Sequence, residues 1–368
     1  MAESARPLLR TAALGLLLVL CAAAFDAEPL YVPGFAALLL ALLATVWVLV
    51  GRRGLRVTRT VSARRVVEEE PVTVALRVHA RRRLPTGALL DPLLMTPWRL
   101  PVGRREAGVR VEVRFGRRGR RVLQPPRVAV QDPLRLLTRM AGGLGVGRHE
   151  VLVLPRLEPV RNVSGDGDDA GALLARRRSS VAAEVELDGL RRHREGSPAS
   201  RIFWPSVAKG GELLERRLRA DSDTRPLVVL DPRAPASEGD LDAAVRAAAS
   251  LVVVLARAGG SALLLPGDRR PIPLDPELAG WPHLHARLAL VVADTPPTLS
   301  GLAARRGPIV YVAARRLTRP PRALAHAPGG GRVLVVPAVI GTRRPSFTVA
   351  GCMGYAFSQA RRPTAKAS

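Results

Sequence analysis

The chain has 368 residues, a formal net charge of +26 and 47% hydrophobic residues, which is enough for two or three domains with packed cores. Its two cysteines, Cys21 and Cys352, exclude a disulfide framework and a cysteine-based zinc site. Only two of the 57 basic residues, Lys209 and Lys366, are lysines, and this preference for arginine is typical of a high-GC genome. Aromatic residues, which stack on bases in nucleic-acid grooves, make up only 4% of the chain, so nucleic acid is not an expected partner.

Two apolar segments occupy the first fifty residues, at about 8–25 and 30–50. The second segment has no charged residue over 21 positions, and roughly 20 apolar residues are enough to cross the hydrocarbon core of a membrane. A short turn with Asp26, Glu28 and the helix-breaking Pro29 separates the two segments. The pattern predicts a transmembrane helical hairpin over residues 1–52, with a cleaved signal peptide as the alternative for the first segment.

Arginines flank both outer ends of this hairpin, whereas the turn between the segments is acidic. Arg6 and Arg10 lie at the start of the first segment, and Arg52, Arg53 and Arg56 follow the second. Positively charged flanks stay on the cytoplasmic side of a membrane. We therefore expect an inner (plasma) membrane protein with both termini and its soluble domains in the cytoplasm.

Residues 55–158 are predicted to form a small antiparallel domain of β-sandwich type. The segments 72–78, 109–115 and 128–130 alternate apolar and polar side chains with a period of two. Between positions 51 and 130 the chain has 20 arginines and only six acidic residues. Two interpretations of this charge stay open: arginines that contact anionic lipid head groups beside the membrane, or a solvated strand face in an arginine-rich chain.

The segment 159–181 combines glycine, serine and clustered charges without an apolar period, which is typical of a linker. From 182 to 357, continuous apolar strands alternate with helices, an order that favours a doubly wound α/β domain with a mainly parallel sheet. The tail at 358–368 is expected to be disordered. The strands are predicted at 227–231, 261–265, 270–274, 288–293, 309–313 and 333–336, and the helices at 240–258 and 276–287.

A polar run around a glycine turn, at 187–218, precedes the first of these strands. Its distinctive positions are Leu190, Arg191, Gly196, Arg201, Ile202, Trp204, Ala208 and Lys209. The run resembles the signature of the domain of unknown function 58 family, which comprises bacterial membrane proteins with a von Willebrand factor type A-like domain. His193, Ser197 and Lys209 stand where that family commonly has tyrosine, aspartate and arginine.

Physical chemistry suggests a structural or partner-binding role for this signature. Ile202 and Trp204 are large enough to fill a domain core, and Arg191 and Arg201 are expected to form charge-assisted hydrogen bonds with Glu215 around the turn. Further positions of the β-domain resemble landmarks of the same family. These are Arg117-Arg118-Gly119, Asp132-Pro133-Leu134-Arg135-Leu136, in which Arg135 replaces a glycine, and Val153-Leu154-Pro155.

The resemblance implies a metal-binding motif of the type Asp-x-Ser-x-Ser at the carboxyl end of the first strand. In this chain the corresponding segment is Asp231-Pro232-Arg233-Ala234-Pro235, so only the aspartate remains. Arg233 would bring a positive charge to the place of the cation, and we therefore expect neither a bound metal nor another cofactor. Asp294, after the predicted strand 288–293, is a second acidic candidate, for which helix capping is the favoured role.

Two classes of function remain. His193, Glu195 and Ser197 are residue types that hydrolases use, but no nucleophile elbow or oxyanion-forming turn accompanies them. The sequence therefore favours a non-enzymatic, membrane-anchored scaffold. The resemblance implies as partners a MoxR-type AAA+ ATPase and a transglutaminase-like membrane protein, in complex assembly or envelope-related processes. The alternative is a hydrolase that uses Asp231 and Asp294 at the edge of the sheet.

Overall fold

The computed structural model describes residues 4–141, 147, 149–163, 190–192, 207–208, 210, 214–216, 225–300, 305, 307–319, 321 and 331–357. The chain divides into two compact units. Unit 1 comprises Met1–Gly116 and Arg120–Val153, and unit 2 comprises Arg117–Gly119 and Leu154–Ser368. The N-terminal hairpin thus belongs to the same unit as most of the strands that directly follow it.

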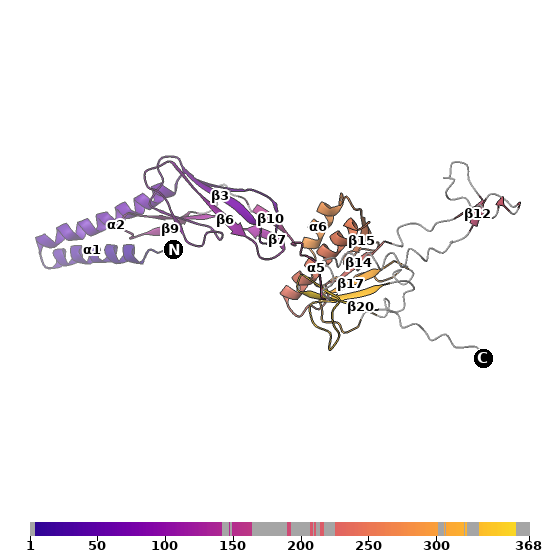
Figure 1. Cartoon of the computed structure of the whole chain (residues 1–368). Helices are drawn as coiled ribbons and strands as arrows, with labels where there is room; N and C mark the ends of the chain where they lie inside the picture. Colours follow the sequence, from indigo (N-terminus) through magenta and orange to yellow (C-terminus); the bar gives the residue numbers. More distant parts are fainter. Residues whose placement is uncertain are drawn as a thin grey trace. The chain divides into compact units, whose positions relative to one another are not determined.

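Two N-terminal helices run antiparallel on either side of a short 3-10 helix (Figure 1). They are α1 (Arg6–Ala24) and α2 (Tyr31–Arg52), joined through η1 (Glu28–Leu30). Their 19 and 22 residues correspond to about 29 and 33 Å at about 1.5 Å per residue. Most of their apolar side chains are exposed, among them Leu17 at 57% and Leu42 at 59%. The prediction of two apolar helices of membrane-spanning length is confirmed.

Small residues line the contact between α1 and α2. Gly15 and Ala22 are buried in α1, and Gly34 and Ala41 are buried in α2. A Cβ atom on Gly15 would lie 2.9 Å from the carbonyl oxygen of Gly34, so a larger residue would push the two backbones apart. Close approach through small residues is how helices associate in lipid, where apolar burial between helices provides no driving force.

Unit 1 continues with β-sheets, and the first two of them are antiparallel. In the first, β1 (Leu55–Val61), β3 (Pro71–Ala80) and β6 (Glu106–Arg114) pair in that order. In the second, the order is β5 (Trp98–Arg99), β4 (Gly87–Leu90), β8 (Arg127–Gln131) and β9 (Thr138–Ala141). The third has the order β2 (Arg65–Val67), β10 (His149–Leu154) and β7 (Gly119–Leu123). The strands predicted at 72–78, 109–115 and 128–130 are confirmed in β3, β6 and β8.

The hairpin and the strands of unit 1 share one hydrophobic core. Val48 of α2 is fully buried in a cluster that contains Leu76 of β3 and Val128 of β8. The backbone nitrogen of Leu8 also donates a hydrogen bond to the carbonyl oxygen of Leu136, with a distance of 3.1 Å. Because only two residues separate α2 from β1, the helix passes almost directly into the sheet.

Unit 2 is built on an eight-stranded mixed sheet. Its spatial order is β11, β19, β20, β18, β17, β14, β15 and β16. The parallel centre consists of β18 (Arg332–Val336), β17 (Ile309–Ala313), β14 (Leu227–Asp231) and β15 (Ser261–Leu264). The flanking antiparallel strands are β11 (Arg161–Asn162), β19 (Phe347–Val349), β20 (Cys352–Phe357) and β16 (Ile272–Leu274).

Two helices cover one face of this sheet in the described part of the chain. Helix α5 (Glu238–Arg257) begins at Ser237, whose hydroxyl accepts a hydrogen bond from the backbone nitrogen of Asp240. Helix α6 (Trp281–Ala289) packs Leu284 and Leu288 into the same core as α5. The other face carries a separate cluster that includes Tyr311 and Leu334, so a doubly wound arrangement stays a prediction.

The sheet differs from the expected mainly parallel one in two respects. The strand predicted at 288–293 is wrong, because Leu288 completes the apolar face of α6 and the residues after Ala289 form a turn. A short apolar run has the same pattern at a helix end and in a strand. In addition, β19 and β20 extend the sheet by antiparallel pairing next to β18.

Residues 155–162 belong to unit 2 and pack against its helices. The ring nitrogen Nε2 of His285 lies 2.7 Å from the carbonyl oxygen of Pro155, and the backbone nitrogen of Glu158 donates to the hydroxyl of Ser250 over 2.8 Å. Val160 is buried in the core under α5. Strand β11, at the start of the segment predicted as a linker, then pairs with β19.

Candidate functional site

The candidate site lies at the carboxyl edge of the parallel strands of unit 2. From β14 the chain first adds β15 on one side and later adds β17 on the other, so the order reverses between β14 and β17. Ligands of open α/β sheets bind in the crevice at such a reversal. Asp231, the last residue of β14, lies opposite Ala313 at the end of β17. The residue singled out by sequence is therefore placed where this fold type binds ligands.

The carboxylate of Asp231 is fully buried and surrounded by donors. Its Oδ1 atom accepts hydrogen bonds from the backbone nitrogen and Nε of Arg233, at 3.2 and 2.8 Å. Its Oδ2 atom accepts from Nη2 of Arg233 at 3.0 Å and from the hydroxyl of Tyr311 at 2.5 Å. Arg315 adds a second guanidinium, with Nη2 located 3.7 Å from Oδ2. Both carboxylate oxygens are thus occupied by the chain itself.

Electrostatics stabilises this arrangement in its charged form. Burial raises the pKa of Asp231, but the hydrogen bonds from Arg233 and Tyr311 outweigh it and place the pKa below that of an ordinary carboxyl group. The hydrogen bond with Asp231 raises the pKa of the Arg233 guanidinium. Burial, together with the same carboxylate, raises the pKa of the Tyr311 hydroxyl, which therefore stays protonated and acts as a donor.

The guanidinium of Arg233 occupies the place that a metal ion would need. It binds both oxygens of Asp231 in the bidentate fork that favours arginine over other cations. Within the described residues, no group of three or more histidine, cysteine, aspartate or glutamate residues could hold a metal ion. The residues present do not fit a bound divalent cation at Asp231, because Arg233 and Tyr311 already donate to both carboxylate oxygens and the guanidinium brings a positive charge beside them.

The outer part of this edge is positively charged. The side chains of Arg233 and Arg315 are 37% and 36% exposed, although each also contacts the buried carboxylate. Arg316 and Arg319 are exposed next to them. Arg316 has no ion-pair partner among the described residues. Since Asp231 is neutralised internally, the solvent-facing side of the edge offers guanidinium groups.

The Arg-Arg-Gly landmark also belongs to unit 2, where it connects the two helices. Arg118 donates from Nη1 to the carbonyl oxygens of Leu288, Ala289 and Val291 at 2.9–3.2 Å, which satisfies the carboxyl end of α6. Asp242 of α5 pairs with Nε of Arg118 at 3.0 Å and with Nε of Arg117 at 2.9 Å. This site is structural, and the sequence did not single out Asp242.

The second landmark forms a turn in unit 1. The buried carboxylate of Asp132 accepts hydrogen bonds from the backbone nitrogens of Leu134, at 2.9 Å, and Leu137, at 2.6 Å. Arg135, the position at which the resemblance implies a glycine, has a φ of 58°. The turn thus keeps the left-handed conformation that glycine prefers, although a side chain occupies the position.

Most of the signature positions lie outside the described residues. These are Gly196, Arg201, Ile202, Trp204 and Lys209. Leu190 and Arg191 lie in β12 (Leu190–Arg192), which pairs antiparallel with β13 (Leu214–Arg216), and Ala208 lies in an exposed turn. The register sets Arg191 opposite Glu215, the pair that the sequence associates around the turn. The predicted burial of Trp204 and Ile202 stays a prediction.

Asp294, the second acidic candidate, is exposed in a turn after α6. Within the described part of the chain it takes part in no hydrogen bond or ion pair. The next residues return toward the end of β15, since the backbone nitrogen of Gly267 donates to the carbonyl oxygen of Pro296 over 3.4 Å. No contact links Asp294 to Asp231 there, and a catalytic pair of the two carboxylates gains no geometric support.

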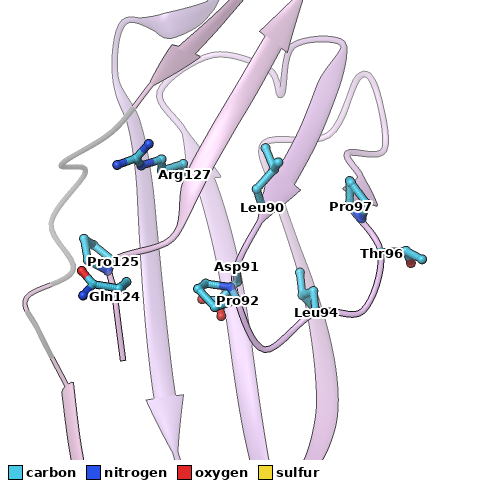
Figure 2. Close-up of a pocket in the computed structure, with 9 residues that line it drawn as sticks. All are labelled: Leu90, Asp91, Pro92, Leu94, Thr96, Pro97, Gln124, Pro125 and Arg127. Carbon is cyan, nitrogen blue, oxygen red and sulfur yellow. The ribbon is translucent and has the colours of Figure 1, made fainter. Parts of the chain in front are cut away.

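A pocket of about 470 Å³ opens in unit 1 between the loop after β4 and the start of β8 (Figure 2). Its walls are mainly apolar and include Pro92, Pro97 and Pro125. The only acid in its wall, Asp91, binds Nη1 of the buried Arg59 at 3.0 Å and the backbone nitrogen of Leu93 at 2.9 Å. Its carboxylate therefore holds the loops together and is not directed at a ligand.

No family model matches the chain, and no curated protein matches it. The functional assignment consequently depends on two features of the molecule itself. These are the exposed apolar hairpin of unit 1 and the arginine-rich sheet edge of unit 2, where Arg233 binds both carboxylate oxygens of Asp231.

Proposed function

We propose that the protein is a membrane-anchored interaction protein, not an enzyme, and that it binds a partner protein at the carboxyl edge of β14 and β17. The observation that carries this proposal is the bidentate ion pair between Asp231 and Arg233, which lies where the strand order of the sheet reverses. A carboxylate whose two oxygens already accept four hydrogen bonds is a poor general base or metal ligand. Around it, the side chains of Arg233 and Arg315 are partly exposed and Arg316 is exposed.

The charge of this edge favours a partner with an acidic contact segment. Arg315 and Arg316 lie two and three residues after the end of β17, and Arg233 lies in the loop after β14. Guanidinium groups bind carboxylates in a bidentate and planar manner, and they lose less hydration than lysine does. Charge complementarity of this kind increases the association rate and restricts the choice of partner.

The hairpin provides the anchor. Apolar side chains such as Leu17 and Leu42 remain exposed on helices that are long enough to span a bilayer. The arginines that flank both outer ends favour a bacterial inner membrane with both termini, and the units that follow, in the cytoplasm. A partner would then meet the sheet edge of unit 2 from the cytoplasm.

The family resemblance supports the identity of the partner. It implies a von Willebrand factor type A-like fold for unit 2, and the parallel centre with an aspartate at the end of its first strand agrees with that fold. It also implies a MoxR-type AAA+ ATPase and a transglutaminase-like membrane protein as partners in complex assembly. The alternative, a hydrolase that uses Asp231 and Asp294, gains no observation in its favour.

Affinity purification of the full chain from native membranes tests the proposal. The double variant Arg315→Glu/Arg316→Glu reverses the charge of the edge and is expected to reduce recovery of the ATPase at least about tenfold, by removing two charge-assisted contacts. The control is Arg269→Glu/Arg270→Glu, which reverses an exposed arginine pair on the turn before β16. Equal recovery with both variants would contradict the proposed edge, and failure of the unmodified chain to enrich an ATPase would contradict the named partner.

A further inference from the structure

Backbone pairing gathers three arginine-rich segments at the end of unit 1 where α2 passes into β1. The backbone nitrogen of Arg81 donates to the carbonyl oxygen of Gly54 over 3.1 Å. The nitrogens of Ala80 and Leu84 donate to the carbonyl oxygens of Arg105 and Arg104, at 2.8 and 2.6 Å. We call the resulting group the arginine collar, and its members are Arg53, Arg56, Arg81, Arg82, Arg83, Arg104 and Arg105.

Every residue of the arginine collar is exposed. Among the residues that the structure describes, none of the seven forms an ion pair. The nearest acid in these segments, Glu106, lies 3.7 Å from the ring of His79 instead. The chain therefore brings seven arginines together, and Glu106, the acid within these segments, forms no ion pair with any of them.

The two ends of the same sheet differ in charge. Leu55 pairs with Ala80 at the collar end, and Val61 pairs with Val74 at the opposite end. At that opposite end, residues 62–70 contain two arginines and three glutamates, and residues 114–121, which begin where β6 ends, contain five arginines. Three of these five form ion pairs, Arg117 and Arg118 with Asp242 and Arg120 with Glu150. The two ends therefore differ in how their arginines are compensated, and the unpaired arginines at the collar end need a local explanation.

The position of the collar supplies that explanation. Arg52 ends α2, Leu55 begins β1, and Val48 in the last turns of α2 is buried in the core of the strands. The collar is therefore fixed to the end of an apolar helix of membrane-spanning length, at the level where that helix leaves the hydrocarbon. Val102, 62% exposed and two residues before Arg104, adds an apolar side chain at the same place.

We propose that the arginine collar binds the anionic phospholipid head groups of the leaflet from which α2 emerges. Each guanidinium can donate two parallel hydrogen bonds to a phosphate, and none of the collar arginines is held in an ion pair within the described part of the chain. Basic residues beside a membrane span are attracted by anionic lipid, and the attraction extends over about one Debye length. The collar thereby holds unit 1 against the membrane surface and selects the lipids around the hairpin. This inference rests on the proposed membrane anchor.

Electron paramagnetic resonance of spin-labelled lipids tests the inference on the full chain reconstituted in phosphatidylcholine bilayers. The fraction of motionally restricted label gives the relative association of phosphatidylglycerol and phosphatidylcholine with the protein. We expect phosphatidylglycerol to associate about fivefold more strongly at low salt, the factor that one arginine near an anionic surface supplies. At 1 M salt, where the Debye length is about 3 Å, the preference should largely disappear.

Matched variants separate the collar from total charge. The collar variant replaces Arg81, Arg82, Arg83, Arg104 and Arg105 with glutamine, and the control replaces the exposed Arg64, Arg65, Arg77, Arg110 and Arg127 with glutamine. The collar variant is expected to lose most of the preference and the control to keep it. An equal loss in both would overturn the collar in favour of net charge.

Two readouts on the unmodified protein keep the collar and the anchor distinguishable. Equal association of the two lipids with the unmodified protein would overturn the collar even if a variant failed to fold. Extraction of the protein from bilayers by alkaline carbonate would contradict the membrane anchor, and the collar with it. Stable integration without a lipid preference would contradict the collar alone.

Discussion

Each unit contains a buried aspartate that pairs with an arginine, and the two pairs differ in sequence separation and in the exposure of the arginine. In unit 1, Arg59 and Asp91 are 32 residues apart, both side chains are fully buried, and Arg59 also donates to the carbonyl oxygens of Leu123 and Gln124. In unit 2, Asp231 and Arg233 are two residues apart, and Arg233 is 37% exposed.

The difference separates a structural contact from a site. A long-range pair without solvent access joins three segments and contributes to the fold. A local pair at the edge of a sheet neutralises one carboxylate and leaves the rest of that edge cationic. In a chain with 57 basic residues, the partner and the exposure of each arginine therefore say more about its role than the total count of arginines does.

The largest effect is expected in unit 1. Arg59→Ala leaves the buried Asp91 without its counterion and should lower the free energy of unfolding by about 3–5 kcal/mol. Denaturant titration of the full chain in detergent measures this loss, and hydrogen exchange of β1 and β8 locates it in unit 1. The double variant Arg59→Met/Asp91→Leu should recover much of this loss, because apolar residues can replace a buried ion pair. A double variant as unstable as the single one would contradict this account of the pair.

A smaller effect is expected at Asp231. Asp231→Asn removes charge-assisted hydrogen bonds from Arg233 and Tyr311 and should lower the stability of unit 2 by about 2–3 kcal/mol at neutral pH. The pKa of Asp231 is lower in the folded protein, so the unfolded chain takes up the proton first as the pH falls. The stabilisation is therefore complete above the ordinary carboxyl pKa of about 3.9 and is lost as the pH decreases below it.

Thermal unfolding between pH 7 and pH 3 checks this prediction. The difference between the unmodified chain and Asp231→Asn should shrink only in the acidic part of the range. Asp275→Asn is the control, since Asp275 pairs with Arg225 but is 62% exposed, and its effect should be small at every pH. A constant difference down to pH 3 would show that the Asp231 carboxylate is not stabilised by its neighbours.

The contact between α1 and α2 is formed by small residues and contains no ion pair, so it can be compared with the two aspartate–arginine pairs. Gly15→Leu places a side chain where a Cβ atom already meets the backbone of Gly34, and it should destabilise the hairpin by about 1–3 kcal/mol. Ala13→Leu adds an exposed leucine two residues earlier and should have little effect. Fluorescence transfer between labels on the two helices reports their separation, and equal transfer in both variants would contradict the close packing.

The smallest effect is a gain in stability. Arg135 has a φ of 58°, so Arg135→Gly relieves a left-handed conformation and should stabilise unit 1 by less than about 1 kcal/mol. Arg127→Gly in β8 is the control and should lower the stability of unit 1, because glycine weakens a strand. We expect the denaturation midpoint of Arg135→Gly above that of the unmodified chain and the midpoint of Arg127→Gly below it. A loss of stability in both variants would contradict the strain at Arg135.

Local patterns predict the hairpin, β3, β6, β8 and the position of Asp231, because each depends on a run of neighbouring residues. The bond between Asp231 and Arg233 is similarly local, because an arginine two residues after an aspartate at the end of a strand can reach its carboxylate. The hydroxyl of Tyr311, 80 residues away, has no such signal, since its place depends on the pairing of β14 and β17. The prediction of a strand at 288–293 is wrong because this apolar run spans the end of α6 and the turn after it.

Local sequence patterns likewise cannot predict ion pairs between residues that are far apart in the chain. Asp242 lies 125 residues after Arg117 in the chain, and its role follows only from the position of α5. The apolar environment of Asp242, which lies among alanines and valines on a helix, is the one indication that it has a buried partner.

Direct contact at the sheet edge is the central claim, and site-specific photocrosslinking in native membranes tests it. A photoreactive residue at Thr318, exposed three residues after Arg315, should form an adduct with the partner, whereas one at Arg269 should not. The adduct should decrease at least about tenfold in the Arg315→Glu/Arg316→Glu background. An adduct at Thr318 that persists unchanged after this charge reversal, or the absence of any adduct there, would contradict the account.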